Sequence, residues 1–178
     1  MTAIDYDLEF LETGREIHLI SIALVADNGD EYYAVNRDMP VRLIRRERWL
    51  MTHVVPHLPQ AHGDRRLTMP KRWLFDYASP LVKRRKQIAD DVAQFILSYP
   101  KPELWADYGA YDHVGLCQLW GRMIDLPDGI PMFTRDLQQE IARLGVTDDE
   151  LPQQTSGFHD ALADARHNQT VRRWLAQR

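Results

Sequence analysis

Apolar and acidic residues alternate along residues 4–10, Ile-Asp-Tyr-Asp-Leu-Glu-Phe. A period of two predicts a β-strand. Its apolar face would carry Ile4, Tyr6, Leu8 and Phe10, and its acidic face Asp5, Asp7 and Glu9. Like charges on one strand face repel one another. The pattern therefore indicates either the solvated side of an edge strand or a face that binds cations.

Two further strands are expected at residues 18–25 and 31–35, because both segments are rich in apolar, β-branched or aromatic residues. Asn28-Gly29 between them predicts a tight hairpin. The first third of the chain should thus form an antiparallel meander. A helix is expected to open at Pro40 and to continue to His53.

The rest of the chain alternates predicted helices with short strands. A helix should begin at Ser79-Pro80 and end near Tyr99-Pro100, and a second should follow Gly109 over residues 110–120. Short strands are expected at 103–106 and 131–134, and later helices at 136–144 and 160–175. Strands followed by helices are typical of an α/β fold.

The chain has 178 residues, of which 44% are hydrophobic and 27% charged, enough for one core. We therefore expect one domain over residues 1–178, with a basic, loop-rich insertion around 60–80. No secretory signal pattern or membrane-length apolar run is visible, so we expect a soluble, cytoplasmic protein without a membrane partner. The single cysteine, Cys117, is expected to be a buried helix residue in a reducing compartment.

Charge is distributed unevenly along the chain, whose net charge is −4. Residues 42–86 hold 12 Lys or Arg and 3 Asp or Glu, a balance of +9. The remaining residues hold 10 basic and 23 acidic side chains, a balance of −13. This separation suits a protein with a basic surface for a polyanion and an acidic site elsewhere.

Several carboxylates are candidates for an acidic site of this kind. Mg²⁺ and Mn²⁺ prefer oxygen ligands, and a pair of these ions can hold both the attacking and the leaving oxygen of a phosphoryl displacement. Asp7 and Glu9 share a strand face, and Asp112 and Asp164 are placed to approach from helices. Asp107, at the end of a short strand, is an alternative to Asp112, whose place in a first helical turn is also favoured by the helix dipole.

His159 is the candidate general base. Asp160 fits a helix N-cap, which leaves His159 just before the helix on a connection where it can swing. A neutral imidazole there can take a proton from an attacking water. Taken singly, His159 also fits a surface loop and Asp164 a solvated helix position, and Asp160 is an alternative to Asp164 that capping already explains.

The combination of Asp7-Leu8-Glu9, Asp112, and His159 followed five residues later by Asp164 resembles the DEDDh exonucleases of the RNase T superfamily. The resemblance extends to a mycobacterial-type 3'-5' exoribonuclease branch over nearly the whole chain outside residues 60–80. It rests on four short sequence segments, at residues 6–10, 31–35, 109–113 and 159–162. The segment at 109–113 is the most specific of them.

The resemblance implies an RNase H-like (exonuclease) fold, a mixed central β-sheet flanked by α-helices. It implies that Asp7, Glu9, Asp112 and Asp164 bind two Mg²⁺ or Mn²⁺ ions and that His159 acts as the base. It further implies a homodimer that releases nucleoside monophosphates from the 3' end of single-stranded RNA or of an RNA 3' overhang. A DNA-directed exonuclease and a non-catalytic nucleic-acid-binding protein are the alternatives.

Two features depart from the superfamily pattern. Phe10 stands where many members carry a small hydroxylated residue, which changes the packing around a terminal nucleotide. The basic segment at 60–86 is also longer than close relatives suggest, and it either follows a phosphate backbone or is ordinary solvated surface. Its side chains are Arg65, Arg66, Lys71, Arg72, Lys83, Arg84, Arg85 and Lys86. Phe10, Tyr111 and Phe158 are candidates for stacking on bases, with core packing as the alternative.

Overall fold

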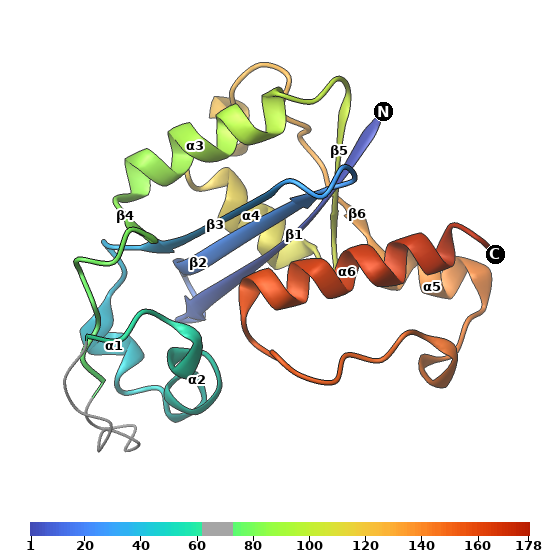
Figure 1. Ribbon diagram of the computed structural model, residues 1–178. Coiled ribbons are helices and arrows are strands. Elements are labelled where there is room, and N and C mark those ends of the chain that lie inside the picture. The colour runs from blue at the N-terminus through green and yellow to red at the C-terminus, as the bar shows by residue number, and fades with distance from the viewer. Residues whose placement is uncertain (62–72) are drawn as a thin grey trace.

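The computed structural model describes residues 1–61 and 73–178, and within them a mixed six-stranded sheet forms the centre of the molecule (Figure 1). The strands lie in the order β4-β3-β2-β1-β5-β6. Their bounds are β1 Thr2–Glu12, β2 Ile17–Ala26, β3 Glu31–Asn36, β4 Val82–Lys83, β5 Pro102–Ala106 and β6 Arg135–Asp136. The first three pair antiparallel, and the β3-β4, β1-β5 and β5-β6 pairs are parallel. The predicted meander is confirmed.

Helices cover both faces of this sheet (Figure 1). They are α1 Val41–Ile44, α2 Arg48–His53, α3 Arg85–Leu97, α4 Ala110–Cys117, α5 Leu137–Leu144 and α6 Ala161–Leu175, with 3₁₀ turns η1 Val55–His57, η3 Met123–Asp125 and η4 Asp148–Glu150. α3 and α4 pack on one face, whereas α6 crosses the other face over β1 and β2 and carries α5 beside it. This is the arrangement of the α/β RNase H-like exonuclease fold, as expected.

β1 is an inner strand with both faces covered. Ile4, Tyr6 and Leu8 belong to the main apolar cluster, together with residues of α3 and α4. The acidic face lies under α6, where Asn168 Nδ2 donates to the Tyr6 carbonyl oxygen at 3.3 Å. The alternative of a solvated edge strand is therefore wrong.

Asp5, on the same face, is fully buried. Arg172 of α6 donates to both its oxygens, Nε to Oδ1 at 2.8 Å and Nη2 to Oδ2 at 2.9 Å, and also reaches Asp27 at 2.5 Å. A buried carboxylate needs such a partner to offset the loss of hydration. Asp5 therefore anchors α6 to the sheet.

Three predicted elements differ from the structure. The helix expected from Pro40 to His53 is broken at residues 45–47 into α1 and α2, and Arg42 and Arg46 would be like-charged i, i+4 neighbours in an unbroken helix. The helix expected from Ser79 begins at Arg85, because residues 82–83 pair with β3. The last strand lies at 135–136 instead of 131–134, where it pairs with β5 immediately before Asp136 caps α5.

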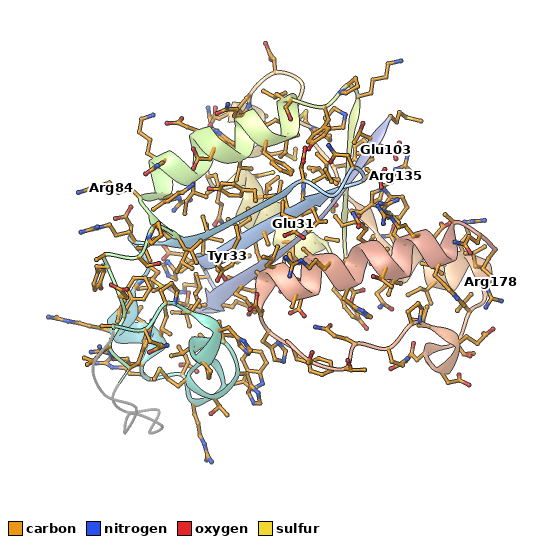
Figure 2. All side chains as sticks on the ribbon, in the orientation of Figure 1. Glu31, Tyr33, Arg84, Glu103, Arg135 and Arg178 are labelled. Atoms are coloured by element: carbon orange, nitrogen blue, oxygen red, sulfur yellow. The ribbon has the colours of Figure 1, made fainter. Side chains whose placement is uncertain are left out.

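The basic segment is partly engaged within the protein. Arg65, Arg66, Lys71 and Arg72 lie outside the described residues. Lys83 pairs with Asp91 at 2.7 Å and Lys86 with Asp90 at 3.0 Å, while Arg85 donates to the Gln118 carbonyl oxygen. Arg84, at the start of α3, is exposed and projects outward at the left of Figure 2.

An ion pair joins the last two strands at the opposite edge of the sheet. Glu103 and Arg135 lie side by side where β5 pairs with β6 (Figure 2), and their side chains meet at 3.0 Å.

Cys117, the last residue of α4, is buried as predicted. Within residues 1–61 and 73–178, no helix combines the length and apolarity that crossing a membrane requires.

Candidate active site

The predicted site residues come from four elements that meet near the carboxyl end of β1. Asp7 and Glu9 lie on β1, Asp112 in the first turn of α4, and Asp164 in the first turn of α6, with His159 in the turn before it. The pairing of β1 with β2 shifts register between Glu9 and Phe10. Such bulges re-aim the side chains of a strand and are frequent beside active sites.

Glu9, His159 and Asp164 form the tightest group. One ligand atom from each lies within 4.8 Å of the others, and Glu9 is buried. Carboxylate oxygens with one imidazole nitrogen are a donor set that divalent cations accept. The three residues are far apart in sequence except for the pair 159 and 164, so the fold itself produces this convergence.

Asp112 reaches the site from the opposite face of the sheet. Its Oδ1 accepts the Leu8 backbone N–H at 2.8 Å, and its side chain is 7% exposed. The ladder between β1 and β5 ends at Asp5 and Trp105, so the Leu8 N–H lies beyond it. Gly115 permits this approach, because a Cβ there would lie 2.8 Å from Leu8 Cδ2. α4 thus packs directly on β1 and delivers Asp112 beside Asp7.

The turn before α6 fixes the backbone of His159. Gly157 has φ +75° and His159 has φ +64°, and the Asp160 N–H donates to the Gly157 carbonyl oxygen at 3.1 Å. A Cβ on Gly157 would lie 2.7 Å from Ala163 Cβ, so only glycine fits. The His159 N–H donates to Asp164 Oδ2 at 2.9 Å. The connection that carries His159 is therefore a hydrogen-bonded turn.

Asp164 is held by a second donor, Gln154, whose Nε2 lies 2.7 Å from Oδ1. Asp160 is the N-cap of α6, as predicted, and its Oδ1 accepts the N–H groups of Leu162 at 3.0 Å and Ala163 at 3.4 Å. Capping thus accounts for Asp160, whereas the carboxylate of Asp164 lies within the group with Glu9 and His159.

Asp107 also lies close to the site, at the end of β5. Two residues beyond the pair Asp5 and Trp105, the parallel register brings it to the level of Asp7. Its Oδ1 accepts Gln138 Nε2 at 2.9 Å, and it lines a cavity of about 240 Å³ between α5 and α6. Burial raises the pKa of Asp107, which the hydrogen bond from Gln138 opposes. Asp107 is thus hydrogen-bonded to a side chain of α5, and Asp112 to the backbone of β1.

Burial and mutual repulsion raise the pKa values of the site carboxylates. Burial, followed by the negative charges of Asp112, Glu9 and Asp164, raises the pKa of Asp7 well above its ordinary value. Burial and the charge of Asp164 raise the pKa of Glu9 to about 8. Burial raises the pKa of Asp112 to about 7, although its hydrogen bond from Leu8 opposes the change. Carboxylates that repel one another in this way favour bound cations.

His159 has the opposite tendency. Burial lowers the pKa of its imidazole, and the nearby side chains of His53 and His57 lower it further, whereas Asp164 raises it. An imidazole with a lowered pKa is neutral near pH 7 and has one nitrogen able to accept a proton. This is the protonation state that a general base requires.

Each of the three aromatic candidates adjoins a site residue in the sequence: Phe10 follows Glu9, Tyr111 precedes Asp112, and Phe158 precedes His159. Phe10 and Tyr111 stack with ring centroids 6.1 Å apart and planes 9° apart, and Phe158 is exposed beside His159. Tyr111 is also exposed, so Tyr111 and Phe158 are not core residues, whereas Phe10 is partly buried against the main apolar cluster.

Two neighbours of His159, Trp49 and His53 of α2, were not predicted from the sequence. They stand four residues apart and therefore on one helix face, but sequence spacing does not indicate what that face meets. Tyr33 of β3, labelled in Figure 2, is a further residue near the site. Burial raises the pKa of its phenol, and the negative charges of Asp160 and Glu9 raise it further.

Comparison with known proteins gives two informative matches. Two 3'-5' exoribonucleases from two strains of Mycobacterium tuberculosis are each 42% identical to this chain over 163 residues, which is 90% of this chain and 85% of each relative. No family model matches the chain.

Proposed function

Because the chain belongs to the family of these mycobacterial 3'-5' exoribonucleases, we propose that it is a DEDDh-type exoribonuclease. In this proposal it hydrolyses phosphodiester bonds from the 3' end of RNA and releases nucleoside monophosphates. The observation that carries the proposal is the convergence of Glu9, His159 and Asp164. They meet beside Asp7 and beside Asp112, whose carboxylate is bound to the strand that carries Asp7 and Glu9.

The carboxylates fit a pair of divalent cations. Asp7, Glu9, Asp112 and Asp164 would hold two Mg²⁺ or Mn²⁺ ions, since these ions prefer oxygen ligands and the pKa values of Asp7, Glu9 and Asp112 are raised first by burial and then by neighbouring negative charge. When bound, the ions would neutralise the phosphate and polarise its oxygens.

His159 would accept the proton of the attacking water at an imidazole nitrogen. Its lowered pKa favours the neutral form, and its backbone hydrogen bond to Asp164 holds it beside the carboxylates. Protonation of the imidazole beside Asp164 is stabilised by the carboxylate charge, so the pair favours proton transfer.

The surroundings suit a single-stranded 3' end. Exposed Tyr111, stacked on Phe10, and exposed Phe158 offer ring faces to terminal bases. Arg42, Arg46 and Arg48 are exposed on the arm formed by α1 and α2, whose Trp49 touches His159. Positive charge there would attract the phosphate backbone leading away from the site. The family resemblance further supports a homodimer, which light scattering on the purified protein would test.

The direct test is digestion of a 5'-labelled single-stranded RNA with Mn²⁺ or Mg²⁺. The proposal requires products that shorten from the 3' end, and it requires EDTA and Asp7→Asn each to abolish them. A parallel digestion of single-stranded DNA of the same sequence separates RNA preference from a DNA-directed activity. Intact RNA in the presence of folded wild-type protein and cation would refute the proposed function.

A further inference from the structure

The imidazole of His159 contacts two aromatic rings of α2. Its ring centroid lies 4.6 Å from that of Trp49 with the planes 71° apart, and 5.6 Å from that of His53 with the planes 70° apart. Trp49 and His53 also contact each other, at 5.1 Å. Edge-to-face contacts at these distances are the favourable geometry for aromatic pairs. The three rings therefore form one cluster, with His159 as the member that belongs to the active site.

α2 holds the two rings in a fixed place. The next two residues after Trp49, Leu50 and Met51, are buried in the second apolar cluster, and Val54, immediately after the helix, is buried there as well. Trp49 itself is 52% exposed and is not a member of that cluster. Among the residues that the structure describes, the aromatic rings that this half-exposed tryptophan contacts are those of His53 and His159.

The imidazole of His159 needs an external constraint. Its backbone is fixed by the turn at residues 157–160, but the imidazole nitrogens make no hydrogen bond to any residue that the structure describes. General bases are ordinarily oriented by a third group that bonds the ring. In this protein, the groups that contact the imidazole ring are the two aromatic rings of α2.

We infer that Trp49 is a positioning residue, which holds the His159 imidazole against Glu9 and Asp164 by edge-to-face contact. This inference rests on the proposed function, because it assigns Trp49 a role only through the base. Without the indole, the imidazole rotates away from the carboxylates for part of the time, and the rate falls in proportion to the lost population. Substrate binding does not depend on this orientation, so the effect belongs to kcat.

The test is a double-mutant cycle between Trp49→Ala and His159→Ala, measured as kcat and KM on single-stranded RNA with saturating Mn²⁺. Trp49→Ala is expected to lower kcat about fivefold, the rate equivalent of one aromatic pair, with KM changed less than about twofold. In the His159→Ala background, Trp49→Ala should change kcat by less than about twofold, because its target is gone.

Three further variants sharpen the outcome. Trp49→Phe keeps an aromatic edge and should retain most of the activity. Trp49→Leu keeps apolar bulk without the ring, should remain folded, and should lose activity as Trp49→Ala does. Leu43→Ala, an exposed apolar position of α1 on the same arm, is the matched control and should behave as wild type.

A loss of kcat that persists in the His159→Ala background would overturn the inference, as would a rise in KM at constant kcat, which is the outcome for stacking of Trp49 on an RNA base. Wild-type kcat in both Trp49→Ala and Trp49→Leu would overturn it as well. Failure of the proposed function is distinct, since wild-type protein would then cleave no RNA in any of these reactions.

Discussion

Replacing Glu9 with glutamine is expected to stabilise the cation-free protein at alkaline pH. Burial, followed by the charges of Asp164, Asp112 and Asp160, raises the pKa of Glu9 from 4.5 to about 8. The folded protein therefore holds a proton on Glu9 that the unfolded chain loses near pH 4.5. Because the folded state binds more protons between these two values, this carboxyl makes stability fall as pH rises from about 4.5 to about 8. Glutamine removes that loss.

The size of the effect follows from the two pKa values. At pH 8 the carboxyl destabilises the fold by at most about 4 kcal/mol, and at pH 5 by about 1 kcal/mol or less. The upper figure includes repulsion shared with neighbouring carboxylates, and a buried glutamine amide also needs partners, so about 2 kcal/mol at pH 8 is expected in practice. For a chain of this length that corresponds to a rise in Tm of about 4–8 °C.

The assay is thermal unfolding by circular dichroism in EDTA, at pH 5 and pH 8, for wild type and Glu9→Gln. Glu140→Gln is the matched control, because Glu140 pairs with Arg143 on α5 and its pKa is lowered by that hydrogen bond. It should lose a little stability at pH 8. Added Mn²⁺ should raise the Tm of wild type and leave that of Glu9→Gln nearly unchanged. Equal or lower stability of cation-free Glu9→Gln at pH 8 would refute the electrostatic reasoning.

Three further expectations follow from the site. His159→Ala should lower kcat by about a hundredfold or more while Mn²⁺ still raises the Tm, measured by RNA digestion and melting; an unchanged rate would assign the base elsewhere. Asp112→Asn should abolish cleavage, whereas Asp107→Asn should retain most of it, because Asp107 is bonded to α5; equal losses would make Asp107 a ligand. Gly157→Ala should cost about 1–3 kcal/mol and lower kcat, since its Cβ would meet Ala163 at a positive φ; wild-type melting would contradict this.

Periodicity predicted the sheet well because its signal is local. The alternation at residues 4–10 identified β1, and Asn28-Gly29 placed the hairpin between β2 and β3. The Asp160 side chain caps α6 as the sequence indicated, since capping depends on neighbouring residues. The same local reasoning failed at residues 82–83, where pairing with β3 replaces the predicted helix.

What sequence did not predict depends on contacts between distant residues. The alternation left open whether β1 was an edge strand, and its pairing with β2 on one side and with β5 on the other shows that it is not. The acidic face is covered by α6, whose Arg172 pairs with Asp5. Arg172, the partner of Asp5, stands 167 residues away. Trp49 was likewise invisible as a neighbour of His159, because nothing in residues 48–53 indicates where α2 docks.

The candidate site lies between these cases. Resemblance to DEDDh exonucleases singled out Asp7, Glu9, Asp112, His159 and Asp164, and the structure brings their elements together at the end of β1. The sequence could name these residues, whereas their distances from one another follow from how α4 and α6 pack on β1.

Digestion of a 5'-labelled single-stranded RNA tests the central claim most directly. With Mn²⁺, wild-type protein should give a ladder that shortens from the 3' end with release of nucleoside monophosphates. Asp7→Asn, which is expected to fold as wild type does, should give none. Undegraded RNA with wild-type protein, or an equal ladder with Asp7→Asn, would contradict the account.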